Sequence, residues 1–302
     1  MSGIVDPAHR IFVSYIDKSR EFYLAHDYGN PYRWAHHDDS PFTALKKPLA
    51  ESRVGLVTTA SVITWDAASE PDPMFVPRDT FAAPTDPAPT ALYTEHRAWD
   101  KEATHTRDVD SFAPINRLRE AAERGRIGSL SPRFYGIPTE YSQRKTHAID
   151  VPRLIDFCRE DGVDVAMLVA LCPVCHQTTS LAARHLEEAG IPTVLLGSAR
   201  DIVEQVAVPR FLFTDFPLGN PCGVPYDVAM QTAIVGMGLD LLESARFPRT
   251  TVQTPFRWHT DDWRENFMHV GDDNREAVRQ AGIERRERQA ERKARDAAAV
   301  PA

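Results

Sequence analysis

The residues of this chain best suited to chemistry are two cysteines and a histidine that lie close together. Cys172 and Cys175 are separated by two residues, and His176 follows directly. Two thiols at this spacing can close a disulfide or share a metal ion, and a thiolate is a strong nucleophile. A histidine beside them could adjust the thiolate or donate a proton. The pattern therefore indicates a reactive dithiol as the candidate site.

The two cysteines lie where a buried strand is predicted to pass into a helix. Residues 165–171 are all apolar, which is typical of a strand that is buried on both faces. The segment from Cys175 to Glu188 has helical spacing, and Gly190 and Pro192 end it. The first turn of a helix presents unpaired N–H groups and the positive end of the helix dipole. Such a place lowers the pKa of a thiol from about 8.5 to roughly 3.5–7.5.

The surrounding region alternates helices and strands in the order that builds a parallel sheet. The patterns predict helices at 151–160, 199–205 and 227–245, and strands at 193–196 and 211–216. The last of these strands leads into a turn that holds Gly219 and Asn220. Because ligands collect at the carboxyl ends of parallel strands, this turn should open on the same edge as Cys172. It lacks the spacing of a dinucleotide fingerprint or a phosphate loop, so no bound cofactor is expected.

We predict an α/β fold with Rossmann-like layers around a parallel sheet, formed by two α/β halves. The first half spans residues 53–150, with a strand at 53–64 and a helix at 114–124, and the second spans residues 151–250 with the two cysteines. An aromatic N-terminal arm, residues 1–52, precedes them and makes a homo-oligomer plausible. A C-terminal extension, residues 251–302, follows and carries a charged helix at 275–296.

Residues 92–100 form a dense cluster of polar groups. His96 and Asp100 stand here beside Tyr93, Glu95 and Trp99, and such groups can bind a ligand or move a proton. A plain surface segment is the alternative interpretation. The stretch before this cluster holds six prolines, which predict a long ordered loop without regular structure, at positions 71, 73, 77, 84, 87 and 89.

Composition narrows the possible partners and the compartment. The chain has 302 residues, of which 42% are hydrophobic and 26% charged, with a formal net charge of −8. The negative charge argues against nucleic acid as the main partner. No apolar run reaches the ~18 residues of a membrane span, and the N-terminus lacks a signal-peptide core. We therefore expect a cytoplasmic protein without a membrane partner, where a close cysteine pair is more often redox-active or metal-binding than a structural disulfide.

Two alternatives to a redox pair, a zinc site and a non-catalytic subunit, remain at this point, and a third, a haem attachment site, is set aside. Cys172, Cys175 and His176 could bind zinc together with Cys222 or a distant histidine, although Cys175 and His176 would seldom both face one ion. The spacing also fits a c-type haem attachment, which requires an exported chain. Finally, the cysteines could pack in the core of a non-catalytic subunit of a larger complex.

Three stretches resemble a known family. They are residues 171–177, LCPVCHQ, residues 214–225, TDFPLGNPCGVP, and residues 114–132, PINRLREAAERGRIGSLSP. All three are similar to the selenoprotein B subunits of glycine, sarcosine, betaine and D-proline reductases. Cys172 stands at the position that is often selenocysteine in this family. The chain thus resembles a cysteine-containing, non-selenocysteine member.

The resemblance implies a thiol-dependent oxidoreductase that reductively cleaves a carbon–nitrogen or related carbon–heteroatom bond of a small-molecule substrate. Cys172 would be the nucleophile, Cys175 the resolving thiol, and His176 would assist them. An external dithiol or a thioredoxin-like donor would reset the pair. Partner subunits are also implied, because the family's reductases are multi-subunit and some partner chains carry a pyruvoyl group. We assign substrate binding to five residues, His96, Asp100, Gln177, Gly219 and Asn220.

Overall fold

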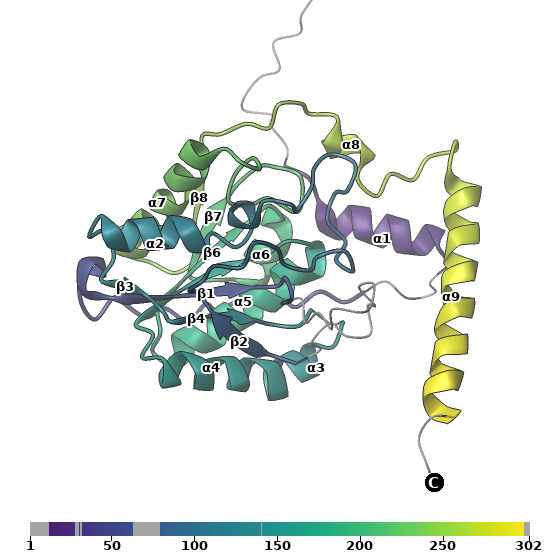
Figure 1. Cartoon of the computed structure of the whole chain (residues 1–302). Helices are drawn as coiled ribbons and strands as arrows, with labels where there is room; N and C mark the ends of the chain where they lie inside the picture. Colours follow the sequence, from purple (N-terminus) through teal and green to yellow (C-terminus); the bar gives the residue numbers. More distant parts are fainter. Residues whose placement is uncertain (1–11, 28–29, 31, 63–78, 140, 299–302) are drawn as a thin grey trace, which may run out of the picture.

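The computed structural model describes residues 12–27, 30, 32–62, 79–139 and 141–298 (Figure 1). Its strands are β1 (Arg53–Thr58), β2 (Phe81–Pro84), β3 (Ser129–Leu130), β4 (Arg133–Gly136), β5 (Val165–Val169), β6 (Thr193–Gly197), β7 (Arg210–Phe213) and β8 (Thr250–Gln253). Its helices are α1 (Tyr15–Ala25), α2 (Ile115–Glu123), α3 (Gln143–Lys145), α4 (Val151–Glu160), α5 (Pro173–Glu188), α6 (Arg200–Val206), α7 (Val228–Ser244), α8 (Trp263–Asn266) and α9 (Arg275–Ala298).

The described strands form one continuous sheet. Their order is β2-β4-β1-β5-β6-β7-β8, and β3 pairs with β1 outside this path. Every pair is parallel except β2 with β4. The expected α/β fold with a largely parallel sheet is confirmed. The sheet runs through both predicted halves, because β1 pairs directly with β5.

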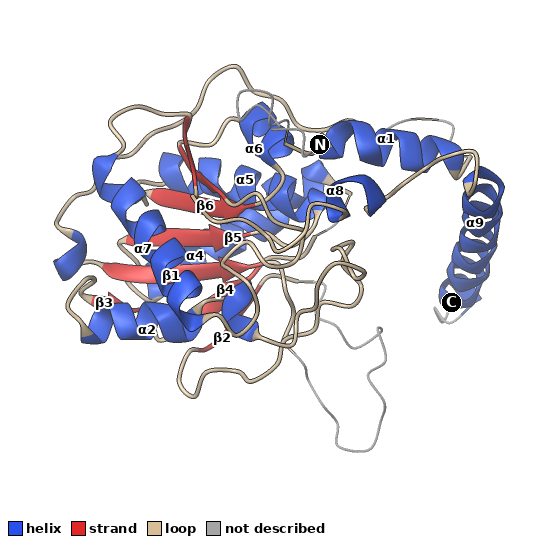
Figure 2. Cartoon of the chain, turned by 90° about the horizontal axis from the view of Figure 1, so that it is seen from above, coloured by secondary structure: helices blue, strands red, loops and turns tan. Residues whose placement is uncertain are grey.

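Helices cover both faces of the sheet, because alternate residues of each buried strand point to opposite sides. In β5, Val165, Met167 and Val169 pack toward α2 and α7. The intervening Ala166 and Leu168 pack toward α4, α5 and α6. Figure 1 shows α2 and α7 on one side of the strands and α4 on the other, and Figure 2 shows the same sheet from above. The apolar run predicted as a doubly buried strand is therefore confirmed, with its last two residues outside β5.

The expectation of no regular structure in the proline-rich stretch is wrong at its C-terminal end. Residues 63–78 lie outside the described residues, but Phe81–Pro84 form β2 at the edge of the sheet. Edge strands tolerate proline, because on their outer side no neighbouring strand needs a hydrogen bond from the N–H that proline lacks. Pro84 pairs with Arg133 in this edge strand.

Helix α5 begins two residues earlier than predicted and is buried almost all round. Cys172 is its N-cap, and Pro173 occupies its first turn. Proline suits the first turn of a helix, because the N–H that it lacks would have no partner there. Gly190 has a φ of 83° just past its end, which favours glycine at a helix terminus. The outer face of α5 is covered by the arm, through hydrogen bonds between Ala35 and Gln177 and between Thr43 and Glu187.

Helices α1 and α9, from the arm and the C-terminal extension, meet beside the sheet. Helix α9 runs past the C-terminal end of α1 (Figure 1). The contact is close at Gly282, where a side chain would collide with the carbonyl oxygen of His26. Arg286 donates to that same oxygen and forms an ion pair with Asp27 at 3.5 Å. Helices α1 and α9 are thereby held together on one side of the molecule.

Candidate active site: a cysteine pair at the floor of a cavity

Cys172 and Cys175 lie at the junction of β5 and α5, and they pair as a disulfide with a Cα–Cα distance of 4.8 Å. Cys172 has an extended backbone and caps the helix, because its Sγ accepts a hydrogen bond of 3.2 Å from the N–H of Cys175. A sulfur in this position faces the positive end of the helix dipole. In the reduced pair, an N–H group and a helix dipole placed in this way would favour a thiolate on Cys172.

The two cysteines differ in their access to solvent. Cys172 is 4% exposed and lines a cavity of about 690 Å³, whereas Cys175 is 0% exposed and does not line it. Sγ of Cys175 instead accepts a long contact of 3.6 Å from the hydroxyl of Thr139. A small molecule in the cavity can therefore reach Cys172 first, with Cys175 behind it.

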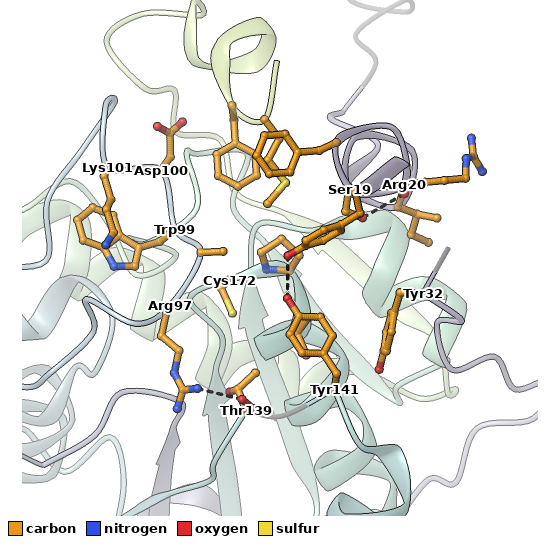
Figure 3. A pocket seen from close by; sticks show the side chains of 18 of the residues that line it. Ser19, Arg20, Tyr32, Arg97, Trp99, Asp100, Lys101, Thr139, Tyr141 and Cys172 are labelled. Carbon is orange, nitrogen blue, oxygen red and sulfur yellow. Dashed lines mark hydrogen bonds between the residues drawn. The ribbon is translucent and has the colours of Figure 1, made fainter. Parts of the chain in front are cut away.

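The cavity is built from parts of the chain that are far apart in the sequence (Figure 3). Its walls come from α1, the arm, the loop 96–102, the first turn of α5, residues 266–268 and α9. Aromatic side chains dominate one side. Tyr32 packs edge-on against Trp34 and Tyr141, with ring centroids 5.0 and 5.4 Å apart, and the hydroxyls of Tyr23 and Tyr141 lie 2.8 Å apart. A space of this size and character suits a small organic ligand.

His176 does not line the cavity. Its Nε2 accepts hydrogen bonds from the N–H groups of Ser198 and Ala199, at 2.8 and 3.1 Å. Nδ1 therefore carries the proton and donates to the carbonyl oxygen of Cys172 at 2.7 Å. Complete burial lowers the pKa of His176 to about 4, against the opposing effect of that hydrogen bond. The ring is thus neutral near pH 7 and holds the Cys172 backbone against the turn that follows β6.

His96 and Asp100 both line the cavity. His96 stacks on Tyr93 at a centroid distance of 5.0 Å, and its pKa is lowered to about 4 by desolvation, then by the charges of Arg97 and Lys101. Asp100 accepts hydrogen bonds on Oδ1 from the N–H groups of Glu102 and Ala103.

The other carboxylate oxygen of Asp100, Oδ2, is buried without a partner among the described residues. Burial raises the pKa of this carboxyl group, and the two backbone hydrogen bonds to Oδ1 oppose the rise. Figure 3 shows Asp100 on the same wall as Trp99, above Cys172. Two residues that the sequence pattern singled out are therefore brought to the same cavity as the thiol.

Gln177 lies one turn into α5 but outside the cavity lining. Its Nε2 donates to the hydroxyl of Tyr32 at 2.6 Å, and its Oε1 accepts from the N–H of Ala35 at 2.7 Å. Tyr32 and Trp34 do line the cavity. Gln177 thus fixes the part of the arm that contributes this aromatic wall.

Gly219 and Asn220 follow β7 on the same edge of the sheet as Cys172, as the parallel strand order requires. They lie behind the cavity wall. Gly219 has a φ of 126° and would carry a side chain into contact with Trp99, so the turn needs the conformational freedom of glycine. The buried amide of Asn220 donates to Ser111 at 2.7 Å and accepts from Thr104 at 2.6 Å. Gly219 thus lies against Trp99 of the loop 96–102, and Asn220 holds the segment that follows this loop.

The remaining cysteines are single buried thiols. Cys158 packs in the core on α4, and burial raises its pKa to about 12. Cys222 is also buried, and its pKa is raised by desolvation and by Asp110. Among the described residues no three His, Cys, Asp or Glu side chains are grouped so that they could hold a metal ion. None of the described helices combines the length and apolar character that crossing a bilayer requires.

Several cavity residues were not identified from the sequence. Tyr23, Tyr32, Tyr141 and Arg285 line the cavity with Cys172, yet they come from the arm, from a loop and from the charged tail. The aromatic residues of the arm were the only sequence feature that pointed to these side chains, and they were interpreted as packing contacts of the arm and not as part of a site. The tail was predicted only as a charged helix, without a role in the site.

The chain is similar to subunits of amino-acid reductases. It is 27% identical over 221 residues to D-proline reductase subunit gamma of Acetoanaerobium sticklandii, covering 72% of this chain and 89% of the relative. It is 24% identical over 190 residues to glycine reductase complex component B subunit gamma of Carboxydothermus hydrogenoformans, covering 61% of this chain and 43% of the relative. The corresponding subunit of Peptoclostridium acidaminophilum is 28% identical over 153 residues, which cover 45% of this chain and 32% of the relative.

These similarities make the chain a distant homologue of the gamma subunits of both reductases. The relatives are, by their names, subunits of multi-component enzymes. The chain spans less than half the length of the two glycine reductase subunits. No protein-family model and no solved structure matches it.

Proposed function

We propose that this chain is the thiol-bearing subunit of a reductase that cleaves a carbon–nitrogen bond of a small substrate. It would be a form with cysteine at the attacking position. The observation that carries the proposal is the asymmetry of the pair. Cys172 faces a cavity of about 690 Å³ from the N-cap of α5, and Cys175 lies behind it within disulfide distance. Distant homology to reductase gamma subunits supports the same reaction class.

The reaction would proceed in two thiol steps. The Cys172 thiolate attacks the carbon that carries the nitrogen, so that a C–S bond forms and the C–N bond breaks. The electron pair leaves with the nitrogen, which takes up a proton. Cys175 then attacks Sγ of Cys172, so that an S–S bond forms and the C–S bond breaks, and the released carbon takes up a proton.

The sum of these steps is a two-electron reduction. One C–N bond is replaced by a C–H and an N–H bond, while the two thiols are oxidised to a disulfide. An external dithiol or a thioredoxin-like donor then returns the disulfide to two thiols by exchange. The carbon that leaves carries negative charge, so the substrate would need a carbonyl group beside it.

The chain's own residues would divide the work. The N–H of Cys175 and the dipole of α5 stabilise the Cys172 thiolate. We assign substrate contact to His96 and Asp100, which line the cavity, and a supporting role to Gln177, Gly219 and Asn220, which hold its walls. His176 would act by positioning Cys172, since both of its ring nitrogens bind backbone groups. Partner subunits, as in the named relatives, would complete the enzyme.

The proposal is tested by substrate-dependent oxidation of the pair. Fully reduced protein is mixed anaerobically with single small amino acids and amines, and the Cys172–Cys175 disulfide is quantified by peptide mass spectrometry. We expect a substrate that drives one disulfide per molecule of amine released, and no turnover in Cys172→Ser. Cys158→Ser is the matched control, because that thiol is buried in the core. Amine release that persists in Cys172→Ser would contradict the proposal.

A further inference from the structure

The cavity that contains Cys172 is rich in cationic side chains, although the chain is acidic overall. Arg20, Arg97, Lys101 and Arg285 line it, against two carboxylates, those of Asp100 and Glu102. The chain as a whole has a formal net charge of −8. A locally positive cavity in a negative protein concentrates anions.

Three of these four cations are held by other groups. Arg20 donates to Asp17, and Lys101 forms an ion pair with Glu95 at 3.1 Å. Arg97 is buried and donates to the carbonyl oxygens of Thr59 and Thr139.

Arg285 differs from them. Within the part of the chain that the structure describes, its guanidinium has neither an ion pair nor a hydrogen bond, while the neighbouring Arg286 is held by His26 and Asp27. The close contact of Gly282 with His26 fixes α9 at this point, so the position of Arg285 at the cavity is set by packing.

The surroundings of Arg285 contain further donors. Desolvation raises the pKa of the Tyr141 phenol, although about half of this side chain is exposed, and the charge of Arg285 opposes the rise. Tyr141 shares a hydrogen bond with Tyr23, and both line the cavity. Arg285 thus lines the same cavity as two phenol hydroxyls. The planar fork of an arginine suits the two oxygens of a carboxylate, because it can donate two parallel hydrogen bonds.

We propose that Arg285 of α9 binds a carboxylate group of the substrate, so that the C-terminal helix completes the site. This inference rests on the proposed function, since it concerns the ligand of the same cavity. It gives the charged tail a role in recognition, with the carboxylate at the α9 wall and the reacting carbon at Cys172.

The test compares a charged and a neutral reagent of nearly the same size. The rate constants for alkylation of Cys172 by iodoacetate and by iodoacetamide are measured in reduced protein. Their ratio is expected to fall roughly fivefold in Arg285→Gln, as loss of one nearby positive charge implies. Arg285→Lys should retain most of the preference. Arg288→Gln is the matched control, because it removes the same charge from the same helix at an exposed ion pair with Glu284.

A second measurement is independent of the thiol. Binding of benzoate and of benzamide is followed by calorimetry, and Arg285→Gln is expected to weaken benzoate about fivefold and to leave benzamide unchanged. The inference would be overturned if wild type, Arg285→Gln and Arg288→Gln had the same ratio of iodoacetate to iodoacetamide rate constants and the same ratio of benzoate to benzamide affinities. A Cys172 that reacts with neither reagent, together with an Arg285-dependent preference for benzoate, would overturn the proposed function and uphold the carboxylate site.

Discussion

The N–H of Cys175 donates to Sγ of Cys172 at 3.2 Å, so one cysteine caps the helix in which the other lies. The hydrogen bond places the outer sulfur at the positive end of α5 and the inner sulfur in the core. The proposed nucleophile, Cys172, and the proposed resolving thiol, Cys175, therefore differ in their position relative to the helix and the cavity.

Exchanging the cysteines one at a time should give different products. In Cys175→Ser the first thiol step can occur but the second cannot, so a substrate fragment should remain on Cys172 as a stable adduct. In Cys172→Ser no adduct should form on Cys175, because Cys175 is buried. Intact-protein mass spectrometry after incubation with a turned-over substrate distinguishes the two. Equal adducts in both variants would be inconsistent with the assignment.

Replacing His176 should affect stability more than proton transfer. His176→Leu leaves the N–H groups of Ser198 and Ala199 without an acceptor in a buried place, at about 1–3 kcal/mol each. We expect a lower free energy of unfolding by denaturant. The exposed His269 provides the control His269→Leu. If His176→Leu is as stable as wild type, His176 does not position the turn.

The pH dependence of stability should carry the signature of the same residue. The folded pKa of His176, about 4, lies below the value of about 6.5 for an unfolded chain. Between these values the unfolded state binds more protons, so stability falls as pH drops from about 6.5 to 4, by up to about 1.4 kcal/mol per pH unit. The difference in the free energy of unfolding between wild type and His176→Leu isolates this contribution, since the other groups titrate alike in both proteins. If this difference does not change between about pH 6.5 and pH 4, the ring of His176 is not buried in its neutral form.

Removing the amide of Gln177 should loosen the aromatic wall. Gln177→Ala deletes the hydrogen bonds to Tyr32 and Ala35, with an expected loss of about 1–3 kcal/mol. Hydrogen exchange should accelerate in the peptide that contains Tyr32 and Trp34, and a cavity ligand such as benzoate should bind more weakly. Gln280→Ala, at an exposed position of α9, is the control. Unchanged exchange in the arm would show that Gln177 does not anchor it.

Asn220 should be required for the segment that directly follows the loop with His96 and Asp100. Asn220→Ala removes hydrogen bonds to Thr104, Ser111 and the carbonyl oxygen of His105, and we expect about 2–3 kcal/mol of lost stability. Proteolysis under native conditions should begin within residues 96–113. If the protease cleaves Asn220→Ala faster elsewhere but not within residues 96–113, Asn220 does not support this segment.

The strand and helix around the cysteines were predictable because local pattern determines them. A doubly buried strand requires a continuous apolar run, and Gly190 ends α5 with a left-handed backbone. The start of α5 was placed two residues late, since cysteine is not among the preferred N-cap residues. Pro173 in the first turn was the signal for the true start. Strand β2 was missed because proline is excluded from central strands but not from edges.

The walls of the cavity were not predictable, because they depend on contacts between distant segments. Nothing local to Arg285 distinguishes it from the other arginines of the tail, and only the packing of Gly282 on His26 brings it to the cavity. His176 shows the opposite limitation. Its type and neighbours suggested proton transfer, but both ring nitrogens are satisfied by backbone groups in the core.

The central claim is that Cys172 is a thiolate nucleophile backed by Cys175. It is tested most directly by the pH dependence of alkylation of the two cysteines in native, metal-free, reduced protein, resolved by peptide mass spectrometry. We predict that Cys172 is labelled with a midpoint well below the usual thiol pKa of about 8.5, that Cys175 is labelled far more slowly, and that mild oxidation protects both. Slow labelling of Cys172 with a midpoint at or above that value would contradict the account.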